Sequence, residues 1–189
     1  MDLNKLPYYS NILLVTGNGR NVGKTTFSCA VIEHLKEEKI IGVKISPHFH
    51  EFDPEEEDVL YQMDDIIIIE EHRKNTGKDS AKLLAAGAYR VFFIMAKDRY
   101  LNKAFRILIE LAGTDYPMII ESAALRNTII PSNFLLLSRP NRPQIKDSIA
   151  HLMEYVDYKM ILNDEKTNLI LENLSYSNSE WKINLTAPF

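Results

Sequence analysis

Residues 11–26 read NILLVTGNGRNVGKTT, and this stretch decides the fold prediction. Its first part, residues 12–15, is an apolar run of the kind that forms a strand buried on both faces. After it, apolar residues recur at spacings of three and four, which predicts an amphipathic helix that ends near Lys39. The sequence therefore predicts a strand and a helix joined by a glycine-rich turn.

The turn contains the residue types that a phosphate-binding loop needs. Small residues let backbone N–H groups point inward at an anion, and the N-terminus of the following helix favours negative charge. A lysine reaches the outer phosphates and a hydroxyl binds Mg²⁺. The alternative is a plain glycine-rich turn, but the flanking strand and helix favour the phosphate loop. We therefore predict nucleotide contacts from one segment, with Lys24 as a catalytic charge and Thr25 as a Mg²⁺ ligand: Gly17, Asn18, Gly19, Arg20, Asn21, Val22, Gly23, Lys24, Thr25 and Thr26.

The rest of the chain alternates between expected strands and helices. Further strands are expected at 40–46, 64–71, 89–95, 116–122, 132–138 and 158–164. Further helices are expected at 77–88, 101–112 and 144–156, a loop at 46–59, and two strands around a polar turn at 167–185. Alternation of this kind predicts an α/β fold with a mostly parallel sheet flanked by helices. With 189 residues and no linker, we expect a single domain, 1–189.

Composition excludes some classes of function. The net charge of −4 argues against a nonspecific nucleic-acid binder, which would carry a basic excess. The single cysteine, Cys29, rules out an intramolecular disulfide and favours a reducing compartment. No apolar run is long enough to span a bilayer, and the first residues lack the apolar segment of a signal peptide. We therefore expect a cytoplasmic protein that binds neither nucleic acid nor membrane.

Polar residues stand where the expected strands end. Ligands of open α/β sheets bind beyond the carboxyl ends of the strands. Glu121 at such an end is predicted to hold Mg²⁺, directly or through water, or to orient the attacking water, which makes it catalytic with Lys24. The strand-end residues as a set are Gly17, Ser46, Glu70, Glu121, Ser138 and Asn163.

Other charged residues have two interpretations each. Lys44 lies inside an apolar strand, where an unpaired charge is costly, so it either binds a phosphate or carboxylate or extends to the sheet end. His48 and His50, with Asp53, are weighed as a metal site, although loop histidines are more often structural or solvated. The helix at 77–88 is interpreted as capped near Asp79 or Ser80, and capping is the preferred explanation for Lys78 and Asp79, although this helix start could also face a partner or the nucleotide.

Four segments resemble known families. The loop has five residues between Gly17 and Gly23, and a valine before Gly-Lys-Thr, in which it resembles the loop of dethiobiotin synthetases. The segments VKISPHFHEFD (43–53), TGKDSAKLLAAGAYRVFFI (76–94) and MIIES (118–122) resemble the molybdopterin-guanine dinucleotide biosynthesis protein B family. With the loop, they cover most of the first 125 residues. After Glu121 the sequence SAALRN departs from the glycine that follows in both families.

The resemblance implies a P-loop NTPase fold of the SIMIBI-like class, whose members assemble their sites as dimers. It implies GTP or ATP as the nucleotide, with GTP favoured, together with Mg²⁺, a phosphate contact from Lys44 and a base contact from Asn163. The implied function is slow hydrolysis as an accessory protein in molybdenum cofactor biosynthesis, acting with a partner enzyme. The alternatives are an ATP-dependent ligase acting on a small carboxylate, as in dethiobiotin synthetase, and a nucleotide-responsive binding module.

A homodimer is expected on the same grounds, because most oligomers are symmetric pairs. Arg20 is a candidate to reach a neighbour's phosphates across the interface. Apolar residues near the C-terminus either supply interface area or complete the sheet of the monomer: Leu169, Ile170, Leu171, Tyr176, Trp181 and Ile183.

Overall fold

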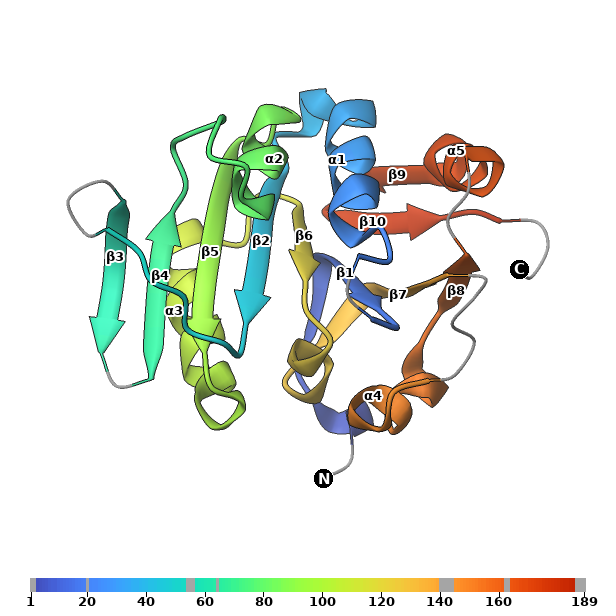
Figure 1. Ribbon diagram of the computed structural model, residues 1–189. Helices are drawn as coiled ribbons and strands as arrows, with labels where there is room; N and C mark the ends of the chain where they lie inside the picture. The colour runs from blue at the N-terminus through green and yellow to red at the C-terminus, as the bar shows by residue number, and fades with distance from the viewer. Residues whose placement is uncertain are drawn as a thin grey trace.

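The structure, a computed structural model, describes residues 3–19, 21–53, 57–63, 65–139, 145–161 and 164–185. At its centre lies an eight-stranded sheet in the order β3-β4-β5-β2-β6-β1-β7-β8 (Figure 1). The strands of this sheet are β1 (Tyr8–Gly17), β2 (Ile41–Ser46), β3 (Asp58–Met63), β4 (Ile66–Glu70), β5 (Arg90–Ala96), β6 (Met118–Glu121), β7 (Ile130–Ser138) and β8 (Tyr158–Ile161). A separate hairpin pairs β9 (Leu174–Ser177) with β10 (Glu180–Ile183).

Most of the sheet is parallel. Strands β5, β2, β6, β1, β7 and β8 run in one direction. Only the two strands at one edge alternate, because β4 is antiparallel to β5 and β3 is antiparallel to β4. The prediction of an α/β fold with a mostly parallel sheet flanked by helices is therefore confirmed.

The helices cover both faces of the sheet (Figure 1). They are α1 (Lys24–His34), α2 (Asp79–Ala85), α3 (Leu101–Ala112), α4 (Asp147–Ala150) and α5 (Asp164–Asn173), with short 3₁₀ turns at Leu3–Lys5, Lys36–Glu38, Asp98–Tyr100, Ala124–Asn127 and Met153–Tyr155. Helices α1, α2 and α5 and the β9–β10 hairpin pack on one face, and α3 packs on the other. No helix in the described ranges is both long and apolar enough to cross a lipid bilayer.

Alternation along the strands divides the core in two. In β1, Leu13 and Val15 pack with residues of α1 and α2, whereas Ile12 and Leu14 pack with residues of α3. This follows from the period of two in a strand, and burial on both faces explains why the sequence of β1 is a continuous apolar run. Glu121, at the carboxyl end of β6 beside Val15, thus lies near the start of α1.

Three expected elements differ from the structure. Residues 58–63 form β3, an edge strand whose residues are all at least partly exposed, although the sequence placed 58 and 59 in a loop and predicted no strand before residue 64. The first half of the expected strand pair at 167–185 is helical and belongs to α5, because a short apolar run fits either element. The expected helix at 144–156 contains one turn of α-helix, α4, followed by a 3₁₀ turn.

The end of α1 and the position of Glu70 are also corrected. Helix α1 ends at His34 instead of near Lys39, and Lys39 adopts a left-handed conformation with φ of 52°. Because β4 is antiparallel to β5, Glu70 lies beside the amino end of β5, whereas Ser46 lies at the carboxyl end of β2. Both carboxylate oxygens of Glu70 accept hydrogen bonds from Arg90. Glu70 is therefore not part of the group of strand ends around Gly17.

Three of the C-terminal apolar residues, Ile170, Trp181 and Ile183, are buried within the chain, whereas Leu169 is exposed. Trp181 is 1% exposed, and its indole N–H donates to the backbone oxygen of Asn11 at 2.9 Å. Ile170 and Ile183 are buried in the same cluster as the residues of α1. Of the two roles considered for this segment, these contacts support completion of the monomer core.

Candidate functional site

The turn between β1 and α1 is closely packed. Gly17 ends β1, and a Cβ atom placed there would lie 2.4 Å from Cγ2 of Val22, so no side chain fits. Val22 is buried in the same cluster as Val15 and the helix α1. Gly23, the residue before α1, has φ of 97°, a conformation that favours glycine. These two glycines shape the turn that places Lys24 at the start of α1.

A cavity of about 510 Å³ opens at the first turn of α1. The first N–H groups of a helix have no partner within the helix, and its positive end attracts anions. One wall is formed by residues 21–26 of the turn and α1. The other wall is formed by β2, α2 and the carboxyl end of β7, through Lys44, Asp79, Lys82, Ser138 and Arg139. The cavity thus combines a helix N-terminus with several cationic side chains.

Lys24 lies within this cavity and folds back over the turn. Its ammonium nitrogen donates to the backbone oxygen of Gly19 at 3.4 Å. Burial lowers the pKa of Lys24, and the carboxylate of Glu121 opposes that change. The long hydrogen bond is a weak one, so the ammonium can exchange it for a stronger acceptor at little cost.

The register of the sheet brings Glu121 to the same place. Strand β6 lies between β2 and β1, and Glu121 is paired with Lys44 on one side and Val15 on the other. Thr25, in the first turn of α1, donates its hydroxyl hydrogen to Oε2 of Glu121 at 3.1 Å. Nζ of Lys44 lies 3.9 Å from the same oxygen. The structure therefore brings together Lys24, Thr25, Lys44 and Glu121, four of the residues singled out in the sequence.

Glu121 is a buried carboxylate that is only half satisfied. The residue is 3% exposed, and Oε1 makes no hydrogen bond of normal geometry with any described residue. Burial raises the pKa of Glu121, while the ammonium of Lys44 and the hydroxyls of Ser28 and Thr25 oppose the rise. Most buried polar atoms in proteins have a partner, so this oxygen marks a place for a cation or a donor from a ligand.

Lys44 has a carboxylate partner. Its ammonium forms an ion pair with Asp79 of α2, which also accepts a hydrogen bond from Lys82 at 3.0 Å. Burial acts to raise the pKa of Asp79, but the hydrogen bonds from the two lysines outweigh it and the pKa is lowered. Of the two interpretations of Lys44, the structure supports the one in which the ammonium binds a carboxylate, here that of Asp79.

The capping interpretation of Asp79 and Ser80 is wrong. Lys78 precedes α2, and no side chain caps the helix there. Asp79 instead binds the two lysines, and the hydroxyl of Ser80 donates to Glu71 at 2.9 Å. Sequence reasoning gave Asp79 a functional role only as a secondary possibility, and it missed Lys82 as a part of the cavity. The available signal was a lysine in an apolar strand that needed a carboxylate from another element.

The remaining predicted contacts differ in position. Asn18 is buried, and its side-chain oxygen accepts a hydrogen bond from the backbone N–H of Lys146 at 3.1 Å. The backbone N–H of Asn18 donates to the backbone oxygen of Leu137. Asn18 thereby ties the turn to β7 and to the segment before α4. Thr26 is exposed at the cavity wall. Arg20 and Asn163 lie outside the described residues, and so do the contacts predicted for them.

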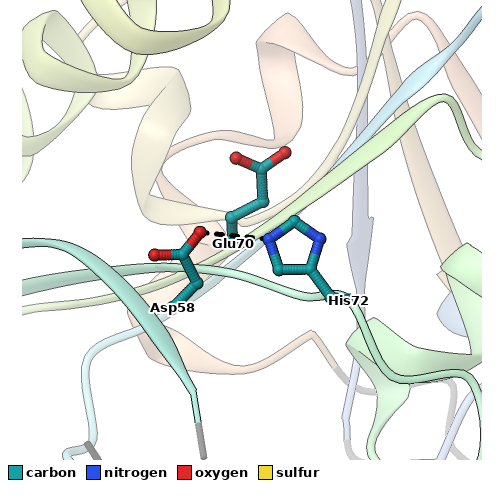
Figure 2. A group of neighbouring side chains, drawn as sticks. All are labelled: Asp58, Glu70 and His72. Carbon is teal, nitrogen blue, oxygen red and sulfur yellow. Dashed lines mark hydrogen bonds and ion pairs between the residues drawn. The ribbon is translucent and has the colours of Figure 1, made fainter.

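A group of possible metal ligands lies at the other edge of the sheet (Figure 2). Asp58 of β3 is paired directly with Glu70 of β4, and Nε2 of His72 lies 3.1 Å from Oδ2 of Asp58. Both oxygens of Glu70 are already bound by Arg90, and the side chains of Asp58 and His72 are 51% and 61% exposed. The His72–Asp58 hydrogen bond and the Glu70–Arg90 ion pair account for this arrangement. His48, His50 and Asp53 do not form such a group in the described structure.

Comparison with known protein families, with curated protein sequences and with solved structures finds no match to this chain. The geometry of the cavity at the start of α1 is therefore the basis for an assignment of function.

Proposed function

We propose that the protein is a P-loop NTPase that binds a nucleoside triphosphate with Mg²⁺ and hydrolyses it slowly. One observation carries the proposal: the Thr25 hydroxyl and the half-satisfied Glu121 carboxylate meet beside Lys24 at the N-terminus of α1. Phosphoryl transfer depends mainly on positioning and on neutralising charge, and these groups supply both. The cavity of about 510 Å³ is in the range that encloses small ligands.

The donor set fits Mg²⁺. The ion prefers oxygen ligands and is commonly held by one or two protein groups, with the remaining positions filled by phosphate oxygens and water. The Thr25 hydroxyl and the Glu121 carboxylate are 3.1 Å apart, and Oε1 of Glu121 accepts no hydrogen bond of normal geometry from the part of the chain that the structure describes. These two residues would hold the ion, which would neutralise charge on the phosphates. Lys24 and Lys44 would contact the phosphates from either side.

The nucleotide and pathway are inferred from the sequence resemblance. We favour GTP, and a role as an accessory GTPase in molybdenum cofactor maturation that acts with a partner enzyme. Calorimetric titration of the protein with GTP and with ATP, each in the presence of Mg²⁺, tests binding and ranks the two. Release of inorganic phosphate, measured in parallel, should be slow. Absence of binding by either nucleotide would refute the proposal.

A homodimer remains part of the proposal, with Arg20 directed at the neighbour's phosphates. Because Ile170, Trp181 and Ile183 are buried within the chain, the interface should involve the region of the phosphate loop and should depend on nucleotide. Light scattering at micromolar concentration should give twice the chain mass of 21.8 kDa when Mg²⁺ and nucleotide are present. A monomer with and without nucleotide would remove Arg20 from the site.

A further inference from the structure

A cavity of about 310 Å³ lies where β1, β7 and β8 begin, whereas the phosphate cavity lies where the parallel strands end. Its charges come from Arg126, Glu154 and Asp157, and an apolar wall comes from Pro131, Phe134 and Val156. The volume is at the lower end of the range of about 300–1,000 Å³ that is usual for ligand sites. We propose that this cavity binds a free α-amino acid with an apolar side chain, whose carboxylate pairs with Arg126 and whose ammonium group faces Asp157 and Glu154. The inference goes beyond the proposed function and does not depend on it.

Arg126 is a buried cation without an anionic partner among the described residues. It lies in the 3₁₀ turn Ala124–Asn127 before β7 and is 3% exposed. Nη1 donates to the backbone oxygens of Leu3 and Ile129 at 3.4 and 3.2 Å, and the guanidinium carbon lies 4.6 Å from the centroid of the Tyr155 ring. Nε is buried and donates to no described residue, and no carboxylate in the described ranges forms an ion pair with the guanidinium. A buried cation is costly unless an anion pairs with it, so Arg126 marks a place for one.

Arg90 shows which anion the open edge of a guanidinium fits. Nε and Nη2 of Arg90 donate to the two carboxylate oxygens of Glu70 at 2.6 and 2.7 Å. This planar, two-pronged pairing is specific for carboxylates and phosphates. In Arg126 the same edge meets no acceptor in the described structure, because both hydrogen bonds of the side chain come from Nη1. A ligand carboxylate would complete the pairing that Arg90 already makes.

Two carboxylates of the protein line the same cavity. Oδ2 of Asp157 accepts a hydrogen bond from the backbone N–H of Phe134 at 2.7 Å, and within the described ranges neither Asp157 nor Glu154 forms an ion pair. Desolvation raises the pKa of Asp157, while the N–H of Phe134 and the charge of Arg126 oppose the rise. A ligand anion alone would be repelled by the two carboxylates, and a ligand cation alone would be repelled by Arg126. The charges therefore favour one small molecule that carries both signs.

The apolar wall sets the rest of the ligand. Pro131 and Phe134 of β7 are buried, and Val156 is half-buried in the segment before β8. None of these side chains can form a hydrogen bond, so a polar ligand side chain against them would lose its water without a replacement. An α-amino acid carries its two charges on one end of the molecule, which leaves an apolar side chain free to lie against this wall.

Fluorine NMR of protein that contains 3-fluorotyrosine tests whether the ligand occupies this cavity. Tyr155 lines it, and the Tyr155→Phe variant identifies its signal. Tyr89, which precedes β5 and packs against Tyr116, is the internal control. L-Leucine at millimolar concentration should shift the Tyr155 signal saturably and leave the Tyr89 signal in place. No shift of Tyr155, or equal shifts of both signals, would overturn the inference.

Three relatives of leucine test the two charges and the side chain separately. 4-Methylpentanoate lacks the ammonium group, 3-methylbutylamine lacks the carboxylate, and glycine lacks the apolar side chain. Each should bind at least about tenfold more weakly than leucine, because each loses one charged pairing or the apolar contact. Equal binding of the acid or of the amine refutes recognition of both charges, and equal binding of glycine refutes the apolar side chain. Removing the carboxylate from the ligand tests Arg126 without a substitution in the buried part of the fold.

Two aspartates give a matched pair of variants. Asp157→Asn removes the charge but keeps a side-chain oxygen that can accept the hydrogen bond from Phe134. Asp98 is exposed in the 3₁₀ turn before α3, outside the cavity. Asp157→Asn should weaken leucine binding about tenfold, and Asp98→Asn should change it by less than about twofold. Equal effects of the two substitutions would show that the ammonium group does not meet Asp157, and would refute the proposed orientation.

Discussion

Replacing Lys24 with alanine should lower the affinity for Mg²⁺-bound triphosphate by about 30- to 150-fold. The ammonium lies at the start of α1 and makes only a 3.4 Å hydrogen bond to Gly19 in the described structure. A charged hydrogen bond to phosphate contributes about 2–3 kcal/mol, and each 1.4 kcal/mol is a factor of ten. The measurement is calorimetric titration with the nucleotide that binds wild-type protein more tightly. Equal affinities of the two proteins would remove Lys24 from the site.

Lys36→Ala is the matched control for this substitution. Lys36 is exposed in the turn that follows α1. The Lys36→Ala substitution therefore removes the same charge at the opposite end of the helix. Its loss should change affinity by less than about twofold, since exposed charges at such separation are screened by salt. If both variants bind equally weakly, the lysines act through net charge and the local contact is refuted.

The sequence predicted the parallel part of the sheet because that part is buried on both faces. Such strands have continuous apolar runs, and β1, β2, β5 and β6 each contain one. The parallel sheet also predicted that Thr25 and Glu121 lie together. Glu121 ends β6, which is paired with β1, and Thr25 lies in the first turn of α1, the helix that follows β1. Their hydrogen bond of 3.1 Å agrees with that expectation.

Other features could not be predicted from local patterns. Strand β3 is an edge strand without a buried face, so it lacks the alternation that marks a half-buried strand. The antiparallel pairing of β4 with β5 places the carboxyl end of β4, and with it Glu70, away from the carboxyl ends of the parallel strands. The ion pair of Lys44 with Asp79 joins residues 35 positions apart, and short-range spacing carries no signal for such a contact. Only the cost of an unpaired lysine in an apolar strand indicated that a partner exists.

Replacing Glu121 with glutamine should abolish the dependence of nucleotide binding on Mg²⁺. The amide keeps the size of the side chain but removes the negative charge that would attract the ion. In wild-type protein, chelation of Mg²⁺ should weaken binding of the triphosphate strongly. In Glu121→Gln, we expect affinities with and without Mg²⁺ within about threefold of each other, a difference of less than 1 kcal/mol. Calorimetric titrations with and without chelator measure this, and a full Mg²⁺ effect in the variant would exclude Glu121 as a ligand.

The stability of the same variant separates a ligand-binding role from a structural one. Burial raises the pKa of Glu121, so the folded protein binds this proton more tightly than the unfolded chain does. The stabilising contribution is therefore complete at low pH and is lost as pH rises through the raised pKa. Above the ordinary pKa of a glutamate, Glu121 is therefore a net cost to the nucleotide-free fold, and Glu121→Gln should be at least as stable as wild-type in denaturant unfolding at neutral pH. Marked destabilisation would show that the carboxylate serves the fold through Thr25 and Lys44. A variant that is stable, and yet insensitive to Mg²⁺, would show that the buried carboxylate is retained for the ion.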